Sequence, residues 1–167
     1  HRGAPTGDAG MEGGIQAMIY PVKGTPKPHQ ELALSEAGGK SHHAFIMDPG
    51  AGKTFTCIAE AGALYEAGKI DGMIVIAPNG VHQQWHDDEF PKWAGYPWHG
   101  TYHKQSARDS KAFWAARPRK LGLFTINYEG LTTKGGRESL AKFQALYPRF
   151  YLVIDESQKC KNPKAQR

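Results

Sequence analysis

The sequence has 167 residues, of which 40% are hydrophobic and 22% are charged, a composition typical of one soluble globular domain with a core of its own. No apolar run approaches the ~18 residues that a membrane-spanning helix needs, and the N-terminus lacks the basic-then-apolar pattern of a signal peptide. The sequence therefore predicts neither a membrane protein nor an exported one. The two cysteines, Cys57 and Cys160, stand in no metal-ligand spacing, so we expect free thiols and an intracellular location. That location would be the cytoplasm, the host cytoplasm if the protein is viral, or the nucleus if it is eukaryotic.

Charge is unevenly distributed along the chain. Residues 1–99 carry 7 Lys/Arg and 11 Asp/Glu residues, whereas residues 100–167 carry 14 and 5, so the overall net charge of +5 combines −4 with +9. A basic half indicates a polyanionic partner such as nucleic acid, although a solvated basic face would give the same count.

Strand-like and helix-like segments alternate after a glycine-rich start. Residues 1–14 hold five glycines and almost nothing to bury, which indicates a disordered leader or an expression remnant, so we assign the foldable domain to residues 15–167. The apolar pattern predicts, in chain order, a helix over 30–38, strands over 43–48 and 72–78 on either side of a helix over 53–68, helices over 81–90 and 106–116, a strand over 121–127, a helix over 137–147 and a strand over 150–156.

This alternation predicts an α/β fold with a mainly parallel sheet and helices on both faces. The run over 72–78 is apolar and β-branched, as in a buried parallel strand. Gly68 is placed to close the helix over 53–68, and Asn79 and Ser106 are placed to cap the helices that follow them.

A phosphate-binding loop is predicted between the strand over 43–48 and the helix over 53–68. Glycines let successive backbone N–H groups curl around phosphate oxygens, and the helix N-terminus adds partial positive charge. A lysine in this position reaches the β- and γ-phosphates, and the next hydroxyl can bind Mg²⁺. The first motif position holds methionine in place of glycine, and a glycine-rich turn before a helix is the simpler alternative. The loop consists of Met47, Asp48, Pro49, Gly50, Ala51, Gly52, Lys53 and Thr54.

A pair of carboxylates follows the last predicted strand. Asp155 and Glu156 lie at its C-terminal end, the edge where ligands bind in open α/β sheets. Asp155 can hold Mg²⁺ and Glu156 can polarise an attacking water. Alone, such a pair is usually a polar turn. Because it stands behind a phosphate loop, we interpret it as the second half of an ATP site.

Taken in order, five blocks resemble the superfamily-two helicases, and more narrowly the Swi/Snf-type helicase-like ATPases, in a viral or bacterial branch. The blocks are Gln30, MDPGAGKT (47–54), IVIAPNGVHQQW (74–85), FTINYEGL (124–131) and LVIDESQKCKNPKAQR (152–167). The resemblance implies the first RecA-like, three-layer lobe of a DNA-dependent ATPase that moves along or remodels duplex DNA with ATP and Mg²⁺.

The resemblance also implies roles for individual residues. Gln30 would read the adenine edge, and Gln158 would relay a hydrogen bond toward the γ-phosphate where the family commonly has histidine. Trp85 matches the first contact block as well, but an aromatic residue after a buried strand is more often part of the core. The residues implied to contact nucleic acid are Asn79, Gln84, Thr125, Asn127 and Tyr128.

The family needs a second RecA-like lobe that supplies arginines, each worth ~10³–10⁵ in rate in related sites. Residues 1–167 do not include such a lobe, so we expect these residues alone to bind ATP and hydrolyse it at a near-background rate. Two other functions stay open: a small P-loop phosphotransferase and a non-catalytic nucleotide-sensing module. No arginine-rich lid is evident, which argues against the phosphotransferase. A non-catalytic module would be expected to lack Lys53 or Glu156, and both are present.

Overall fold

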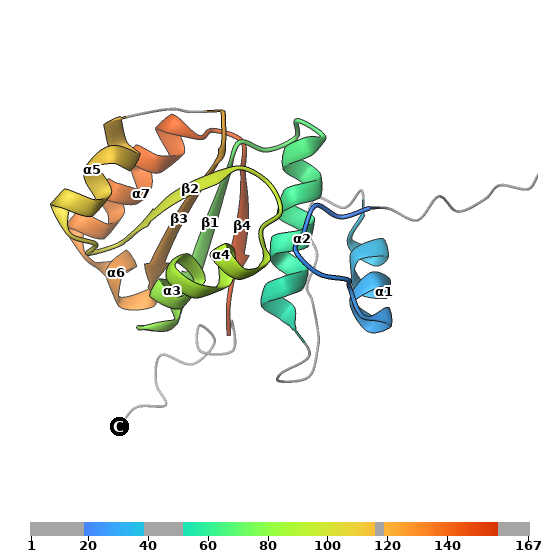
Figure 1. Ribbon diagram of the computed structural model, residues 1–167. Coiled ribbons are helices and arrows are strands. Elements are labelled where there is room, and N and C mark those ends of the chain that lie inside the picture. The colour runs from blue at the N-terminus through green and yellow to red at the C-terminus, as the bar shows by residue number, and fades with distance from the viewer. Residues whose placement is uncertain (1–18, 39–51, 116–118, 157–167) are drawn as a thin grey trace, which may run out of the picture.

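The computed structural model describes residues 19–38, 52–115 and 119–156 (Figure 1). Within these residues the strands form one all-parallel sheet in the order β2-β3-β1-β4. Its strands are β1 (Gly72–Ala77), β2 (Trp98–Tyr102), β3 (Leu121–Asn127) and β4 (Phe150–Ile154). The helices are α1 (Pro28–Ala37), α2 (Lys53–Glu66), α3 (Val81–Gln84), the π-helical turn η1 (Trp85–Glu89), α4 (Phe90–Trp93), α5 (Ala107–Ala115), α6 (Tyr128–Thr132) and α7 (Lys134–Leu146).

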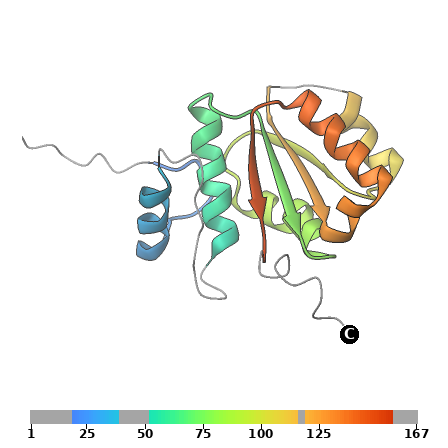
Figure 2. The same ribbon diagram turned by 180° about the vertical axis from the view of Figure 1, so that it is seen from behind.

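Helices cover both faces of the sheet because the central strands are apolar on both sides. Met73 and Val75 of β1 pack with α2 and with the helical segment over 81–93, whereas Ile74 packs with α5 and α7 on the other face. In both views α2 lies against the sheet and α1 lies on the outer side of α2 (Figures 1 and 2). The predicted α/β fold, a parallel sheet between two helical layers, is confirmed.

Most predicted elements are present with small shifts of their ends. The strand over 121–127 is correct at both ends. The helix over 53–68 ends at Glu66, and Gly68 follows with a φ of +69°, the left-handed conformation expected after a helix C-terminus. The Ser106 hydroxyl accepts the Asp109 N–H at 3.1 Å, which confirms that cap. The strand predicted over 43–48 and the leader over 1–14 lie outside the described residues.

The structure also corrects the prediction at four places. Asn79 does not cap the next helix: Gly80 is the capping residue, with a φ of +81°, and no side chain makes a cap hydrogen bond there. The edge strand β2 was not predicted, because its sequence WHGTY mixes polar and aromatic residues that are mostly half-buried. The short helix α6 was also missed, and α7 begins three residues before the predicted start at residue 137.

The helix predicted over 81–90 extends to Trp93 and contains a π-helical turn. The Phe90 N–H donates to the Trp85 carbonyl, five residues earlier, in place of the usual four. Trp85 and Phe90 are both buried in the core on the α2 side. No helix among the described residues is long and apolar enough to cross a membrane.

Candidate functional site

The carboxyl ends of three strands meet at one edge of the sheet. Ala77 at the end of β1 is in register with Asn127 at the end of β3. The Asp155 N–H, one residue beyond β4, donates to the Ile76 carbonyl at 2.8 Å. The N-terminus of α2 lies at this same edge (Figure 1). Segments about 100 residues apart in the sequence therefore converge where ligands bind in α/β sheets.

The start of α2 is built around Gly52. Gly52 has a φ of +84°, and a Cβ placed on it would lie 2.2 Å from Nε2 of Gln30. A side chain here would therefore be strained and would collide with Gln30. Lys53, exposed, and Thr54, half-buried, are the first two residues of this 14-residue helix. The backbone N–H groups of such a first turn favour anions.

Gln30 lies beside this turn although it is 22 residues earlier in the chain. It is 5% exposed and occupies the first turn of α1. Its Oε1 accepts the Lys27 N–H at 2.8 Å, and its Nε2 approaches the Gly52 carbonyl at 3.5 Å, a long contact. The structure therefore brings the predicted adenine-reading residue to the predicted phosphate loop.

The charges of Lys53 and Asp155 both affect the pKa of the buried Cys57 thiol. Burial raises the pKa of Cys57 far above its usual range, the Glu60 and Asp155 carboxylates raise it further, and Lys53 opposes them. The two predicted site residues, 102 positions apart, are thus near enough to influence one group on α2. Cys57 forms no disulfide, as predicted, and Cys160 lies outside the described residues.

Asp155 is held by two aromatic residues from other segments. The Trp85 indole N–H donates to Asp155 Oδ2 at 3.1 Å, and the Tyr128 hydroxyl donates to the Asp155 backbone carbonyl. Glu156 follows, exposed, with a φ of +52°. A non-glycine residue in this left-handed conformation costs about 1–2 kcal/mol, and such strain clusters at functional sites.

The residues predicted to contact nucleic acid differ in accessibility. Asn79 and Gln84 are exposed, and Tyr128 is half-buried. Asn127 is 9% exposed and its Nδ2 donates to Glu129 at 3.0 Å. Thr125 is fully buried, and its hydroxyl donates to the His82 carbonyl at 2.6 Å. The Thr125 side chain therefore joins β3 to α3 rather than facing a ligand, a role that the sequence pattern does not predict.

Several predicted site residues lie outside the described parts of the chain. They are Met47, Asp48, Pro49, Gly50, Ala51 and Gln158. Within the described ranges no group of three or more His, Cys, Asp or Glu residues could hold a metal ion. A nucleotide-bound Mg²⁺ needs fewer protein ligands, since substrate phosphates and water complete its shell, and Thr54 and Asp155 fit that lighter requirement.

Two buried histidines at this edge were not singled out by the sequence. His82 on α3 is 2% exposed and His103 after β2 is 9% exposed. Nδ1 of His82 and Nε2 of His103 have no hydrogen-bond partner among the described residues. Burial lowers the pKa of both rings, and Lys104 lowers that of His103 further. Burial also lowers the pKa of His99 on β2.

We expect the folded protein to lose stability below about pH 6.5, the usual histidine pKa. His82, His99 and His103 bind a proton more weakly in the folded than in the unfolded chain, because burial lowers their pKa. Stability is therefore full above the unfolded pKa and falls as pH drops toward the folded values, by about 1.4 kcal/mol per pKa unit of each shift. Urea unfolding at pH 7.5, 6.5 and 5.5 measures this loss. His82→Gln should make the decline shallower, and an equal decline in that variant would contradict the assignment.

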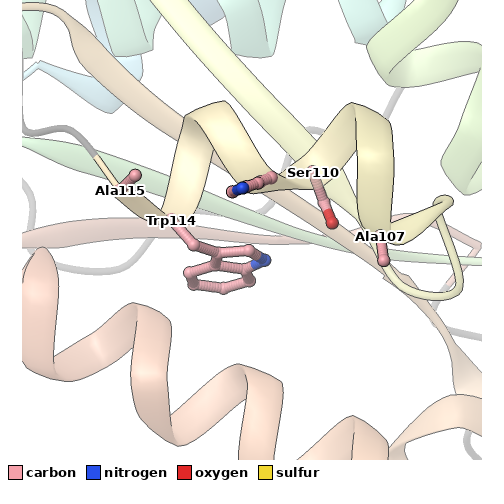
Figure 3. Close-up of a pocket in the computed structure, with 5 residues that line it drawn as sticks. Ala107, Ser110, Trp114 and Ala115 are labelled. Carbon is pink, nitrogen blue, oxygen red and sulfur yellow. The ribbon is translucent and has the colours of Figure 1, made fainter.

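A separate shallow pocket lies along α5. It is lined by Ala107, Ser110, Lys111, Trp114 and Ala115 (Figure 3). Lys142 of α7 places its ammonium 4.6 Å from the centre of the Trp114 ring. The pocket contains none of the residues predicted to bind nucleotide, and a single helix lines it. We therefore assign the candidate site to the carboxyl edge of the sheet.

Comparison with known families gives one match. The family described as the SNF2-related domain matches residues 36–167. The match includes the loop over 47–54, the carboxyl ends of the strands, and Asp155 and Glu156, whereas Gln30 precedes it. No curated protein matches the sequence.

Proposed function

The chain belongs to the SNF2-related family, and from that premise we propose that it binds ATP with Mg²⁺ and that the protein uses ATP hydrolysis to move along or remodel duplex DNA. The membership confirms the predicted family and the helicase-like ATPase class of the domain. The binding of ATP and the action on DNA are the proposal.

One observation carries the proposal: the predicted phosphate-binding and acidic residues meet at the carboxyl edge of the sheet. Lys53 begins a helix at that edge, and Asp155 is bonded to the neighbouring strand there. If Lys53 were only a solvated helix end and Asp155 with Glu156 only a polar turn, nothing would require the two segments to lie at the same edge of the sheet. The positive φ of Glu156 adds a strained residue at the same place.

Each residue has a defined part in the proposed site. Lys53 and the first-turn N–H groups of α2 bind the phosphates, and Gln30 reads the adenine edge. Thr54 and Asp155 would hold Mg²⁺, which neutralises phosphate charge when bound. Glu156 orients the attacking water and accepts its proton. The charge on the far side of the γ-phosphate would come from arginines of a second lobe, as in the family.

Nucleic acid is proposed to lie across the same edge. Four basic side chains follow the carboxyl ends of β2 and β3, and all are exposed: Lys104, Arg108, Lys134 and Arg137. Arg137 also donates to the Thr132 carbonyl at 2.6 Å, which fixes its guanidinium near α6. Contacts to phosphates position a protein on a duplex without reading its sequence.

Duplex DNA binding tests this surface. We expect weak, sequence-independent binding with a dissociation constant of about 10⁻⁴–10⁻⁶ M. Lys104→Ala with Lys134→Ala should weaken binding more than tenfold at 50 mM salt, and should reduce the slope of log K against log salt by about 1.8, since each phosphate contact contributes about 0.9. Fluorescence anisotropy with a labelled duplex at several salt concentrations measures both quantities.

The matched control removes two lysines from the opposite edge. Lys69 precedes β1 and Lys120 precedes β3, and both are exposed. Lys69→Ala with Lys120→Ala lowers the net charge equally but should leave the salt slope unchanged. If both pairs of substitutions weaken binding alike, net charge and not this edge drives association, and the proposed surface is wrong.

A further inference from the structure

The Trp85 side chain contacts the candidate magnesium ligand from inside the core. Trp85 is 2% exposed, and its indole N–H donates to Asp155 Oδ2 at 3.1 Å across 70 residues of sequence. An indole N–H is only a donor, and a bond to a carboxylate is stronger than one between neutral groups. The bond therefore satisfies a buried donor and also fixes one oxygen of Asp155.

The π-helical turn explains how Trp85 reaches this position. Trp85 and Phe90 lie five residues apart, and both face the core on the α2 side. In a regular α-helix, residues five apart point about 140° away from each other. The turn closed by the bond from the Phe90 N–H to the Trp85 carbonyl contains one residue more than an α-helical turn. This wider turn brings both side chains inward. Single π-turns of this kind are frequent at functional sites.

Tyr128 fixes the backbone of the same residue. Its hydroxyl donates to the Asp155 carbonyl, and the Asp155 N–H donates to Ile76. With both backbone groups of Asp155 bonded, rotation of the side chain is the motion that can still misplace its carboxylate. The hydrogen bond from the Trp85 indole N–H to Asp155 Oδ2 restricts that rotation.

We propose that Trp85 is a positioning residue that holds Asp155 Oδ2, so that Oδ1 is presented to Mg²⁺ bound with nucleotide. This inference rests on the proposed function of the site. Hydrogen bonds to a ligating carboxylate orient it, and losing such a partner typically costs 10–100-fold in metal affinity. Trp85 thus ties the helix that follows β1 directly to the metal ligand.

Trp85→Phe tests the inference, because it keeps an aromatic ring in the core and removes the N–H donor. Fluorescent ADP is titrated with Mg²⁺, and the Mg²⁺ concentration at half-maximal binding is measured. We expect Trp85→Phe to need 10–100-fold more Mg²⁺ than the unaltered protein, with ADP affinity in excess EDTA unchanged. A defect in packing alone would lower ADP affinity in EDTA as well.

Trp93→Phe is the matched control. Trp93 is half-buried, and its indole N–H donates to Glu89 Oε2 at 3.0 Å, a bond of the same kind to a carboxylate outside the proposed site. Its Mg²⁺ requirement should stay within twofold of the unaltered protein. An equal Mg²⁺ requirement in Trp85→Phe and Trp93→Phe would overturn the inference and leave the proposed function standing. Absence of Mg²⁺-dependent ADP binding in the unaltered protein would overturn both.

A second measurement needs no substitution at Trp85. The protein has four tryptophans, so its nitrogen-edited NMR spectrum contains four indole N–H signals. Addition of Mn²⁺ with ADP should broaden the Trp85 signal strongly while the Trp98 and Trp114 signals persist, because paramagnetic broadening depends on closeness to the metal. A Trp85 signal that survives as well as those two in the nucleotide-saturated protein would overturn the inference.

Discussion

Lys53→Ala is expected to abolish the rise in melting temperature that ATP or ADP with Mg²⁺ causes in the unaltered protein. A ligand at about 100 times its dissociation constant stabilises the folded state by about 2.7 kcal/mol, which corresponds to roughly 5–10 °C for a protein of this size. Lys53 begins α2 and is exposed at the proposed phosphate position. Its ammonium supplies the one side-chain positive charge that we assign to the phosphates, so its loss should remove binding rather than reduce folding.

The control lysine lies beyond the other end of the same helix. Lys69 is also exposed and follows the C-terminus of α2. Lys69→Ala removes the same charge far from the carboxyl edge of the sheet and should keep the full thermal shift. Melting curves of the three proteins with and without Mg²⁺ and nucleotide decide the matter. A melting-temperature shift that persists in Lys53→Ala would show that nucleotide binding does not depend on the predicted phosphate-binding loop.

The parts of the fold that the sequence predicted are those with an unambiguous apolar pattern. β1 and β3 are apolar runs because both faces of the sheet are covered; both were predicted as strands, and β1 was predicted to be buried. β2 lies at the edge of the described sheet and is mostly half-buried, so its sequence carries no comparable signal. Edge strands tolerate polar residues, which makes them hard to distinguish from loops.

In the candidate site, too, some features were predicted from the sequence and others depend on the tertiary structure. Lys53, Asp155 and Glu156 were predicted from local motifs that place charge after a strand or before a helix. The contact between Trp85 and Asp155 depends on the π-turn and on strand order, and neither can be read from local spacing. The nucleic-acid contact suggested by the motif position of Thr125 stays a prediction, and the hydrogen bond from its hydroxyl to the His82 carbonyl could not be read from that motif.

Glu156→Gln is expected to lower DNA-stimulated ATP hydrolysis by about 10²–10⁴-fold, the usual contribution of a general base, while ADP binding with Mg²⁺ is retained. Glutamine keeps the shape and a hydrogen-bonding oxygen but cannot accept the proton of the attacking water. Phosphate release in the presence of a second RecA-like lobe, with and without duplex DNA, measures hydrolysis, and the thermal shift of residues 1–167 measures binding.

The pattern across two substitutions separates the proposed roles of Lys53 and Glu156. Lys53→Ala should remove both binding and hydrolysis, whereas Glu156→Gln should remove hydrolysis alone, because Glu156 acts on water and not on the nucleotide. Glu66→Gln, at the exposed end of α2, loses the same charge away from the site and should change neither. If Glu156→Gln hydrolyses ATP within a few-fold of the unaltered protein, the left-handed turn at Glu156 serves the fold only and another group activates the water. If it loses the thermal shift as well, Glu156 is part of the binding site, and its assignment as the base is wrong.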